Sequence, residues 1–102
     1  MRIVLRPAIH PGEVLADELD ELKLSAAAFS RAVHVPTNRI TQILRGERSI
    51  TADTALRFGH YFGTGPELWI NLQRNYDLRV AEHTSGETIR STITPLPNPV
   101  ST

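Results

Sequence analysis

The stretch that decides the fold is residues 25–50, SAAAFSRAVHVPTNRITQILRGERSI. Its first part predicts a short helix, because Phe29 and Val33 stand four residues apart on one face and small residues lie beside them. A tight turn is expected at His34-Val35, and Pro36 suits the start of a second helix because its φ angle is already set. The small side chains allow the two helices to approach closely at a steep angle.

The second helix has an apolar side and a polar side. Its apolar residues recur at the i, i+3, i+4 spacing of a buried helix face: Ile40, Ile43 and Leu44. The other side and its flanks carry hydroxyl, amide and guanidinium groups: Thr37, Asn38, Arg39, Thr41, Gln42 and Arg45. Asn and Gln match the donor and acceptor of adenine, Arg matches guanine or a phosphate, and about three helical turns fit a major groove.

A polar helix face is often only solvated, so three further details decide the interpretation. This face has no acidic residue, its side chains near the N-terminus are short, and Arg45 and Arg48 stand at its end. An acid would repel DNA phosphates, so the absence of one matters. We interpret the stretch as a helix-turn-helix whose second helix, the recognition helix, enters double-stranded DNA.

The segment before the motif predicts a first helix. It opens at residues 10–13, HPGE, where Pro11 suits the first helical position and Glu13 meets the positive end of the helix dipole. Its expected core residues are Val14, Leu15, Leu19 and Leu22. Ser25 is the expected N-cap of the next helix.

The segment after the motif predicts a fourth and a fifth helix. The fourth starts at the N-cap Thr51 and ends at Gly63, and its expected core residues are Ala55, Leu56, Phe58, Gly59 and Phe62. The fifth starts at the T-x-x-E capping box of residues 64–67 and runs to about Ala81. Because it holds more apolar surface than one small core needs, we predict a dimer interface that includes Trp69, Leu72, Tyr76 and Val80.

The domain therefore spans residues 10–82, between two segments of different composition. Residues 1–9 predict a short extended or flexible arm, whose two arginines could touch a DNA backbone. Residues 83–102 predict a flexible tail rich in Thr and Pro, in which residues 88–94 are compatible with an edge strand.

Composition and charge narrow the function. The 102 residues make one domain, and they contain no Cys and no apolar run long enough to span a membrane or to act as a secretory signal, which favours a cytoplasmic protein. The net charge is zero, but residues 13–22 hold five acids and no base, whereas residues 39–57 hold four Arg and two acids. A bipolar molecule of this kind suits DNA on one side and a basic partner on the other, with Asp17, Glu18 and Glu21 as the candidate partner site.

Catalysis and metal binding are not expected, nor is any cofactor. Four His residues are scattered without metal-ligand spacing, no Cys joins them, and the clustered acids lack a companion base: His10, His34, His60 and His83.

Two runs, HPGEVLADELDEL and VPTNRITQILRGERSITADTALRFGHYFGTGPELWINLQRNYDL, resemble the HigA family of antitoxins from bacterial toxin–antitoxin modules. The resemblance covers roughly residues 9–80. It implies an all-α, five-helix, lambda-repressor-like helix-turn-helix domain that binds an operator as a homodimer and represses its own operon. It also implies neutralisation of a cognate HigB-type toxin, typically a small basic mRNA endonuclease that depends on the ribosome.

Carried over by position, the resemblance implies base contacts from Thr37, Asn38, Arg39, Thr41 and Gln42, and backbone contacts from Arg45, Arg48 and Thr51. Two positions depart from the family pattern: His34 stands where Gly is common, and Ser30 where Ala is. Both are tolerable, because His accepts a positive φ better than most residues and Ser is small. Two alternatives remain open, a stand-alone helix-turn-helix repressor without a toxin and a protein-interaction module that binds no DNA.

Overall fold

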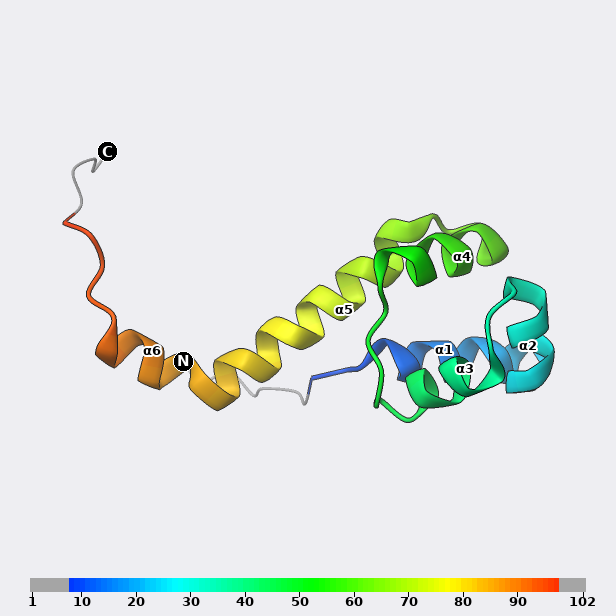
Figure 1. The fold of residues 1–102 in the computed structure, drawn as a ribbon, viewed down its shortest axis with the longest axis horizontal. Coiled ribbons are helices and arrows are strands. Elements are labelled where there is room, and N and C mark those ends of the chain that lie inside the picture. The colour runs from blue at the N-terminus through cyan, green and yellow to red at the C-terminus, as the bar shows by residue number, and fades with distance from the viewer. Residues whose placement is uncertain (1–7, 98–102) are drawn as a thin grey trace.

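The computed structural model describes residues 8–97, and over this range the chain folds into helices joined by short turns (Figure 1). The α-helices are, in order, α1 (Pro11–Leu22), α2 (Ala26–Val33), α3 (Thr37–Leu44), α4 (Ala52–Phe62), α5 (Pro66–Ala81) and α6 (Glu87–Thr92), and a π-helical turn, Glu82–Gly86, joins the last two. The predicted all-α helix-turn-helix fold is confirmed. Most of the predicted N-terminal arm and the end of the predicted tail lie outside the described residues.

One apolar core holds α1 to α4 and the first turns of α5 together. Aromatic rings link its layers, with Phe58 lying 5.1 Å from Phe29 and 5.2 Å from Trp69 between ring centroids. The buried apolar side chains are those of Leu15, Leu19, Phe29, Val33, Val35, Ile40, Ile43, Ile50, Ala55, Phe58 and Trp69. We call this compact part, residues 10–77, the head.

The helices of the head begin at capping residues that the sequence partly predicts. Ser25 Oγ accepts the N–H of Ala28 at 3.0 Å, and Thr51 Oγ1 accepts the N–H of Thr54 at 3.2 Å, so both predicted N-caps are confirmed. α1 and α3 pack closely at Gly12. A Cβ at this position would overlap the Ile43 carbonyl oxygen. The N-terminus of α1 therefore presses on the end of the recognition helix.

Three predictions about the head are wrong. Leu22 and Leu56 are 49% and 59% exposed rather than in the core, because each lies on the solvent side of its helix. The T-x-x-E capping box does not form, because Gly65 has a φ of 84° and α5 starts one residue later than that box requires. The Thr64 hydroxyl donates to the Gly65 carbonyl oxygen instead.

Beyond the head, the last turn of α5, the π-helical turn and α6 form a helical arm, residues 78–97, that projects to one side (Figure 1). The predicted strand at residues 88–94 is wrong, since α6 occupies most of it. A strand needs a neighbour for its backbone groups, whereas a helix satisfies them internally, and Arg90 adds an ion pair of 2.6 Å with Glu82. The whole described chain measures 53 × 27 × 25 Å, and none of its helices is long and apolar enough to cross a membrane.

Candidate nucleic-acid interface

The turn between α2 and α3 depends on a left-handed residue. His34 has φ 61° and ψ 49°, so the residue that replaces the common Gly adopts the conformation that a Gly would favour. Its N–H and that of Val35 bond back to carbonyl oxygens of α2, and the Val35 side chain is buried between the helices. The predicted tight turn at these two residues is confirmed.

Arg57 of α4 fastens this turn to the rest of the head, a role that the sequence analysis missed. Its guanidinium donates to the carbonyl oxygens of Val33 and His34 at 2.9 and 3.2 Å. Its Nε donates to Asp53 at 2.8 Å, four residues earlier on the same helix. The spacing of an acid and an Arg at i and i+4 was the available signal, but the two carbonyl partners depend on the fold.

The predicted DNA-binding residues remain accessible in the described chain. Thr37, Asn38, Arg45, Arg48 and Thr51 are exposed. Arg39, Thr41 and Gln42 are half-buried. These eight side chains belong to α3, to the loop that follows it, or to Thr51, which is the N-cap of α4. The polar side of α3 therefore stays uncovered by the head.

Hydrogen bonds fix the hydroxyl groups at the start of α3. Ser30 Oγ donates its only proton to the Ala27 carbonyl oxygen at 2.7 Å and lies 2.9 Å from Thr37 Oγ1. Thr37 must then be the donor in that second contact. Thr41 Oγ1 likewise donates to the carbonyl oxygen of Asn38 at 3.1 Å. Both threonine hydroxyls can therefore only accept a further bond.

A side-chain bond also joins the recognition helix to the loop that follows it. Arg48 Nε donates to Gln42 Oε1 at 2.8 Å. An arginine has donors and no acceptor, so the amide of Gln42 turns its oxygen toward Arg48.

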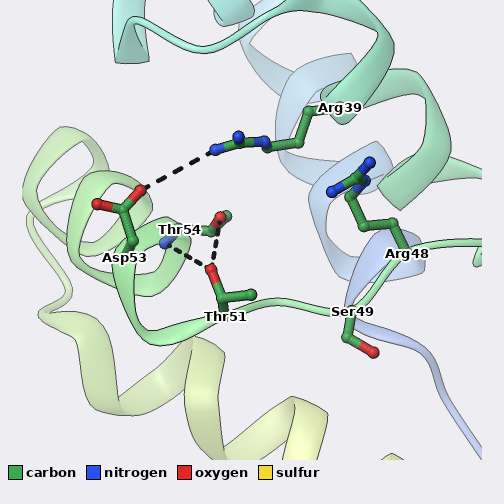
Figure 2. A pocket seen from close by; sticks show the side chains of 6 residues that line it. All are labelled: Arg39, Arg48, Ser49, Thr51, Asp53 and Thr54. Carbon is green, nitrogen blue, oxygen red and sulfur yellow. Dashed lines mark hydrogen bonds and ion pairs between the residues drawn. The ribbon is translucent and has the colours of Figure 1, made fainter.

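A shallow hollow lies where this loop enters α4, lined by Arg39, Arg48, Ser49, Thr51, Asp53 and Thr54 (Figure 2). Figure 2 shows the side chains of Arg48 and Ser49 pointing to opposite sides of the loop. The Asp53 carboxylate lies 4.0 Å from the Arg39 guanidinium. The Thr51 hydroxyl donates to the Thr54 hydroxyl and accepts the Thr54 N–H. A phosphate here would meet two arginines and the free amides that begin α4, but it would compete with Asp53 for Arg39.

Two buried polar residues that the sequence analysis missed hold this loop in place. His10 caps α1 by accepting the Gly12 N–H on Nδ1 at 2.8 Å, packs edge-on against Tyr76 with 4.8 Å between ring centroids, and bonds to the backbone of Arg48. Gln73 accepts the Ile50 N–H at 2.7 Å and donates to Asp77 at 2.9 Å.

The pKa of His10 reflects this burial. Desolvation lowers the pKa below its ordinary value of 6.5, although Glu13, Asp77 and the bond to the Arg48 backbone favour the charged form. The neutral ring keeps Nδ1 free of a proton, which the cap on Gly12 requires.

The other predicted sites lie away from the recognition helix. Asp17, Glu18 and Glu21 are exposed along α1. Among the predicted dimer residues, Trp69 is 1% exposed and packs inside the head, so it has no surface to offer a second subunit. Leu72 is half-buried against the same core and Tyr76 is half-buried, whereas Val80 is 40% exposed on the arm.

The chain is similar in sequence and in fold to known helix-turn-helix proteins. Residues 15–69 match the helix-turn-helix family model. Virulence-associated protein I of Dichelobacter nodosus is 53% identical over 77 residues, which are 74% of this chain and 71% of that protein. A HigA-family addiction module antidote protein from Coxiella burnetii is 54% identical with a TM-score of 0.85. The Pseudomonas aeruginosa antitoxin HigA, solved with the higBA promoter, is 45% identical, also with a TM-score of 0.85. Each of these two structures covers 90% of this chain and is itself covered completely.

Proposed function

Because this chain belongs to the HigA family of helix-turn-helix antitoxins, we propose that it represses its own operon as a homodimer and neutralises a toxin encoded beside it. The family consists of DNA-binding regulators rather than enzymes. Both proposed activities place the protein in the cytoplasm. The toxin expected from the family is of the HigB type, a small basic mRNA endonuclease.

The observation that carries the DNA-binding proposal is the uncovered, acid-free side of α3. Asn38 is exposed in the first turn of α3 and can offer both a donor and an acceptor to a base. Thr37, Arg39, Thr41 and Gln42 lie on the same helix, while Arg45, Arg48 and Thr51 are exposed beyond its end. We assign the first group to bases and the second to the DNA backbone.

The test of base contact uses a duplex that covers the DNA upstream of the gene. Asn38→Ala should weaken binding to this duplex by about 1–3 kcal/mol and leave binding to random DNA nearly unchanged. Asn71→Ala, on the exposed side of α5, is the matched control and should bind like the unmodified protein. Equal loss on both duplexes would show that Asn38 does not contact bases.

The test of backbone contact uses salt. Arg45→Ala should weaken binding to every duplex and reduce the slope of log K against log salt by roughly 0.9 for the lost phosphate contact. Arg74→Ala on α5 provides the control for the loss of one positive charge at a distance. A slope that stays the same in Arg45→Ala would remove this residue from the backbone contacts.

The arm supports the proposal of a homodimer. Its exposed apolar side chains, Leu78, Val80, Ile89, Ile93 and Leu96, have no apolar cover comparable to that of the core of the head. A two-fold partner that covers them would hold two copies of α3 at a fixed spacing, as pseudo-palindromic operators require, roughly 34–36 Å apart. Of the residues predicted for this interface, Tyr76 and Val80 remain in the proposal.

Sedimentation tests the dimer. Val80→Asp should give a monomer at concentrations where the unmodified chain is a dimer, because a charge would enter an apolar interface. Leu56→Asp places the same charge on an exposed apolar position of α4 and should remain a dimer. A dimeric Val80→Asp protein would move the interface away from the arm.

The toxin site is proposed on α1, where Asp17, Glu18 and Glu21 present an acidic face to a basic protein. Reversal of Asp17 and Glu21 to Lys should abolish capture of the small basic protein encoded next to this chain and spare DNA binding. The control reverses Glu67 and Glu87, two exposed acids on α5 and α6. Undiminished capture would leave the acids of α1 as a solvated face, and absence of any adjacent basic protein would favour the stand-alone repressor.

A further inference from the structure

We propose that Arg48 is a positioning residue for Gln42, and that the pair reads guanine in the operator. This inference rests on the proposed DNA binding by α3. The family resemblance implies a base contact for Gln42 and a backbone contact for Arg48, as two separate roles. Their hydrogen bond makes them one unit.

The bond decides which atoms Gln42 can present. Arg48 Nε lies 2.8 Å from Gln42 Oε1, and the amide cannot flip, because its NH₂ group would then meet a group that only donates. The NH₂ group of Gln42 is left to face the DNA. The Arg48 guanidinium has further N–H groups close to the Gln42 NH₂ group, so the two side chains together form a cluster of hydrogen-bond donors.

The loop that carries Arg48 is held by the head and does not depend on DNA for its position. The backbone of Arg48 bonds to His10, and the N–H of Ile50 bonds to Gln73; both of these side chains are buried. The N–H of Glu47 closes the start of the loop on the Gln42 carbonyl oxygen at 2.8 Å. Arg48 therefore reaches Gln42 from a fixed backbone, and the amide is oriented before DNA arrives.

A cluster of donors selects guanine among the bases. In the major groove guanine offers two adjacent acceptors, N7 and O6, whereas adenine offers one acceptor and an amino group. Free glutamine pairs with adenine because its oxygen accepts from that amino group. Here the oxygen already accepts from a cation, and the same positive charge repels the amino group of adenine. Once a duplex excludes water from the pair, the difference increases because the local dielectric constant falls.

The experiment selects duplexes from a random pool and then measures affinity for single-base variants of the selected site. The unmodified chain should prefer guanine over adenine at one position of each half-site by about tenfold or more. Gln42→Ala should lose that preference at that position only. Arg48→Ala should lose it at the same position and move toward adenine, because the amide is released, and the double variant should discriminate no better than either single variant. Circular dichroism verifies that each variant is folded.

Arg45→Ala is the matched control, because it removes an exposed arginine near Gln42 that is not bonded to it in the structure. It should weaken all duplexes alike and keep the guanine preference. The inference is overturned if Arg48→Ala behaves in this same way, or if the unmodified chain prefers adenine at the position that Gln42→Ala affects. Those results would leave the proposed DNA binding intact. Failure of the unmodified chain to enrich any sequence would remove both the inference and the proposed DNA binding.

Discussion

The head and the arm are both helical, but different contacts hold them. In the head, α3 is fixed by a buried core, by the Ser30–Thr37 bond to α2 and by the close contact of Gly12. In the arm, the specific links are exposed, such as the Glu82–Arg90 ion pair, and the apolar side chains face outward. Exposed ion pairs contribute little to stability, whereas buried apolar contacts contribute most of it.

This difference indicates which part of the molecule can work alone. The head positions its recognition helix with contacts from its own chain, so a single subunit already presents the shape that DNA would meet. The arm exposes Leu78 and Ile93, each 62% accessible, and a second surface that covered these side chains would stabilise it. Mutations should therefore act on folding in the head and on assembly in the arm.

The largest expected effect compares one truncation in each region. Phe29→Ala in the head should lower the free energy of unfolding by about 3–5 kcal/mol, because Phe29 is fully buried among the rings of Phe58, Tyr61 and Phe62. Leu78→Ala in the arm should change it by no more than about 0.5 kcal/mol at low protein concentration. Urea unfolding at several protein concentrations measures both. A large loss in Leu78→Ala at every concentration would show that the arm packs on its own head.

The next effect concerns the junction of the two regions. Gln73→Leu should cost about 1–3 kcal/mol, because the buried N–H of Ile50 loses the amide oxygen that accepts it and the apolar side chain cannot replace that oxygen. The local reporter is hydrogen exchange of the Ile50 amide, which should become much faster. Asp77→Asn keeps an oxygen for the Gln73 amide and should leave that exchange rate unchanged. Slow exchange in Gln73→Leu would contradict this role in the loop.

The same division explains how much could be predicted from the sequence. The helices of the head follow from apolar periodicity and from local signals such as Ser25, Thr51 and Gly63, all of which act within a few residues. The turn at His34 and the polar side of α3 were predictable for the same reason. Within the candidate site, the surface position of the polar residues was predictable, whereas their bonds to one another were not.

The contacts that could not be predicted join residues that lie far apart in the sequence. Gln73 meets Ile50 across 23 positions, and Arg57 meets Val33 across 24, so no local pattern predicts either bond. The prediction of a strand at residues 88–94 failed because its alternation of Ile and Thr suits a strand only where another strand can pair with it. Trp69 was assigned to the dimer interface because its helix is rich in apolar residues, and only packing shows that it belongs to the core of the head.

A smaller effect compares how much a buried hydroxyl in the head and an exposed hydroxyl in the arm contribute to the free energy of unfolding. Ser30→Ala in the head should cost about 0.5–1.5 kcal/mol, because Ser30 is buried and its bond to Thr37 is lost. Ser91→Ala in the arm removes an exposed hydroxyl that donates to the Thr88 carbonyl oxygen, and it should be neutral or slightly stabilising because Ala favours helices. Thermal unfolding of the two variants measures the difference. Equal losses would contradict the contrast between the head and the arm.

The smallest expected effect is confined to acid pH and comes from His10. Because burial lowers the pKa of His10 in the folded chain below 6.5, the unfolded chain binds more protons between the two pKa values. The stability contributed by neutral His10 is therefore complete above about pH 6.5 and is lost as the pH falls through the folded-state pKa. Protonation of Nδ1 would also break the cap on Gly12 and disturb the loop that carries Arg48.

His10→Asn provides the matched test of that effect, because Asn is a good N-cap that can accept the same N–H without titrating. Unfolding measured from neutral to acid pH should show the loss at acid pH in the unmodified chain and a smaller one in His10→Asn. Since the arm contains no part of this cap, Val80→Asp should keep the full pH dependence when both proteins are compared as monomers. A pH profile that is the same with and without His10 would assign the acid sensitivity to carboxylates, and it would remove the cap of α1 from the contacts that set the recognition loop.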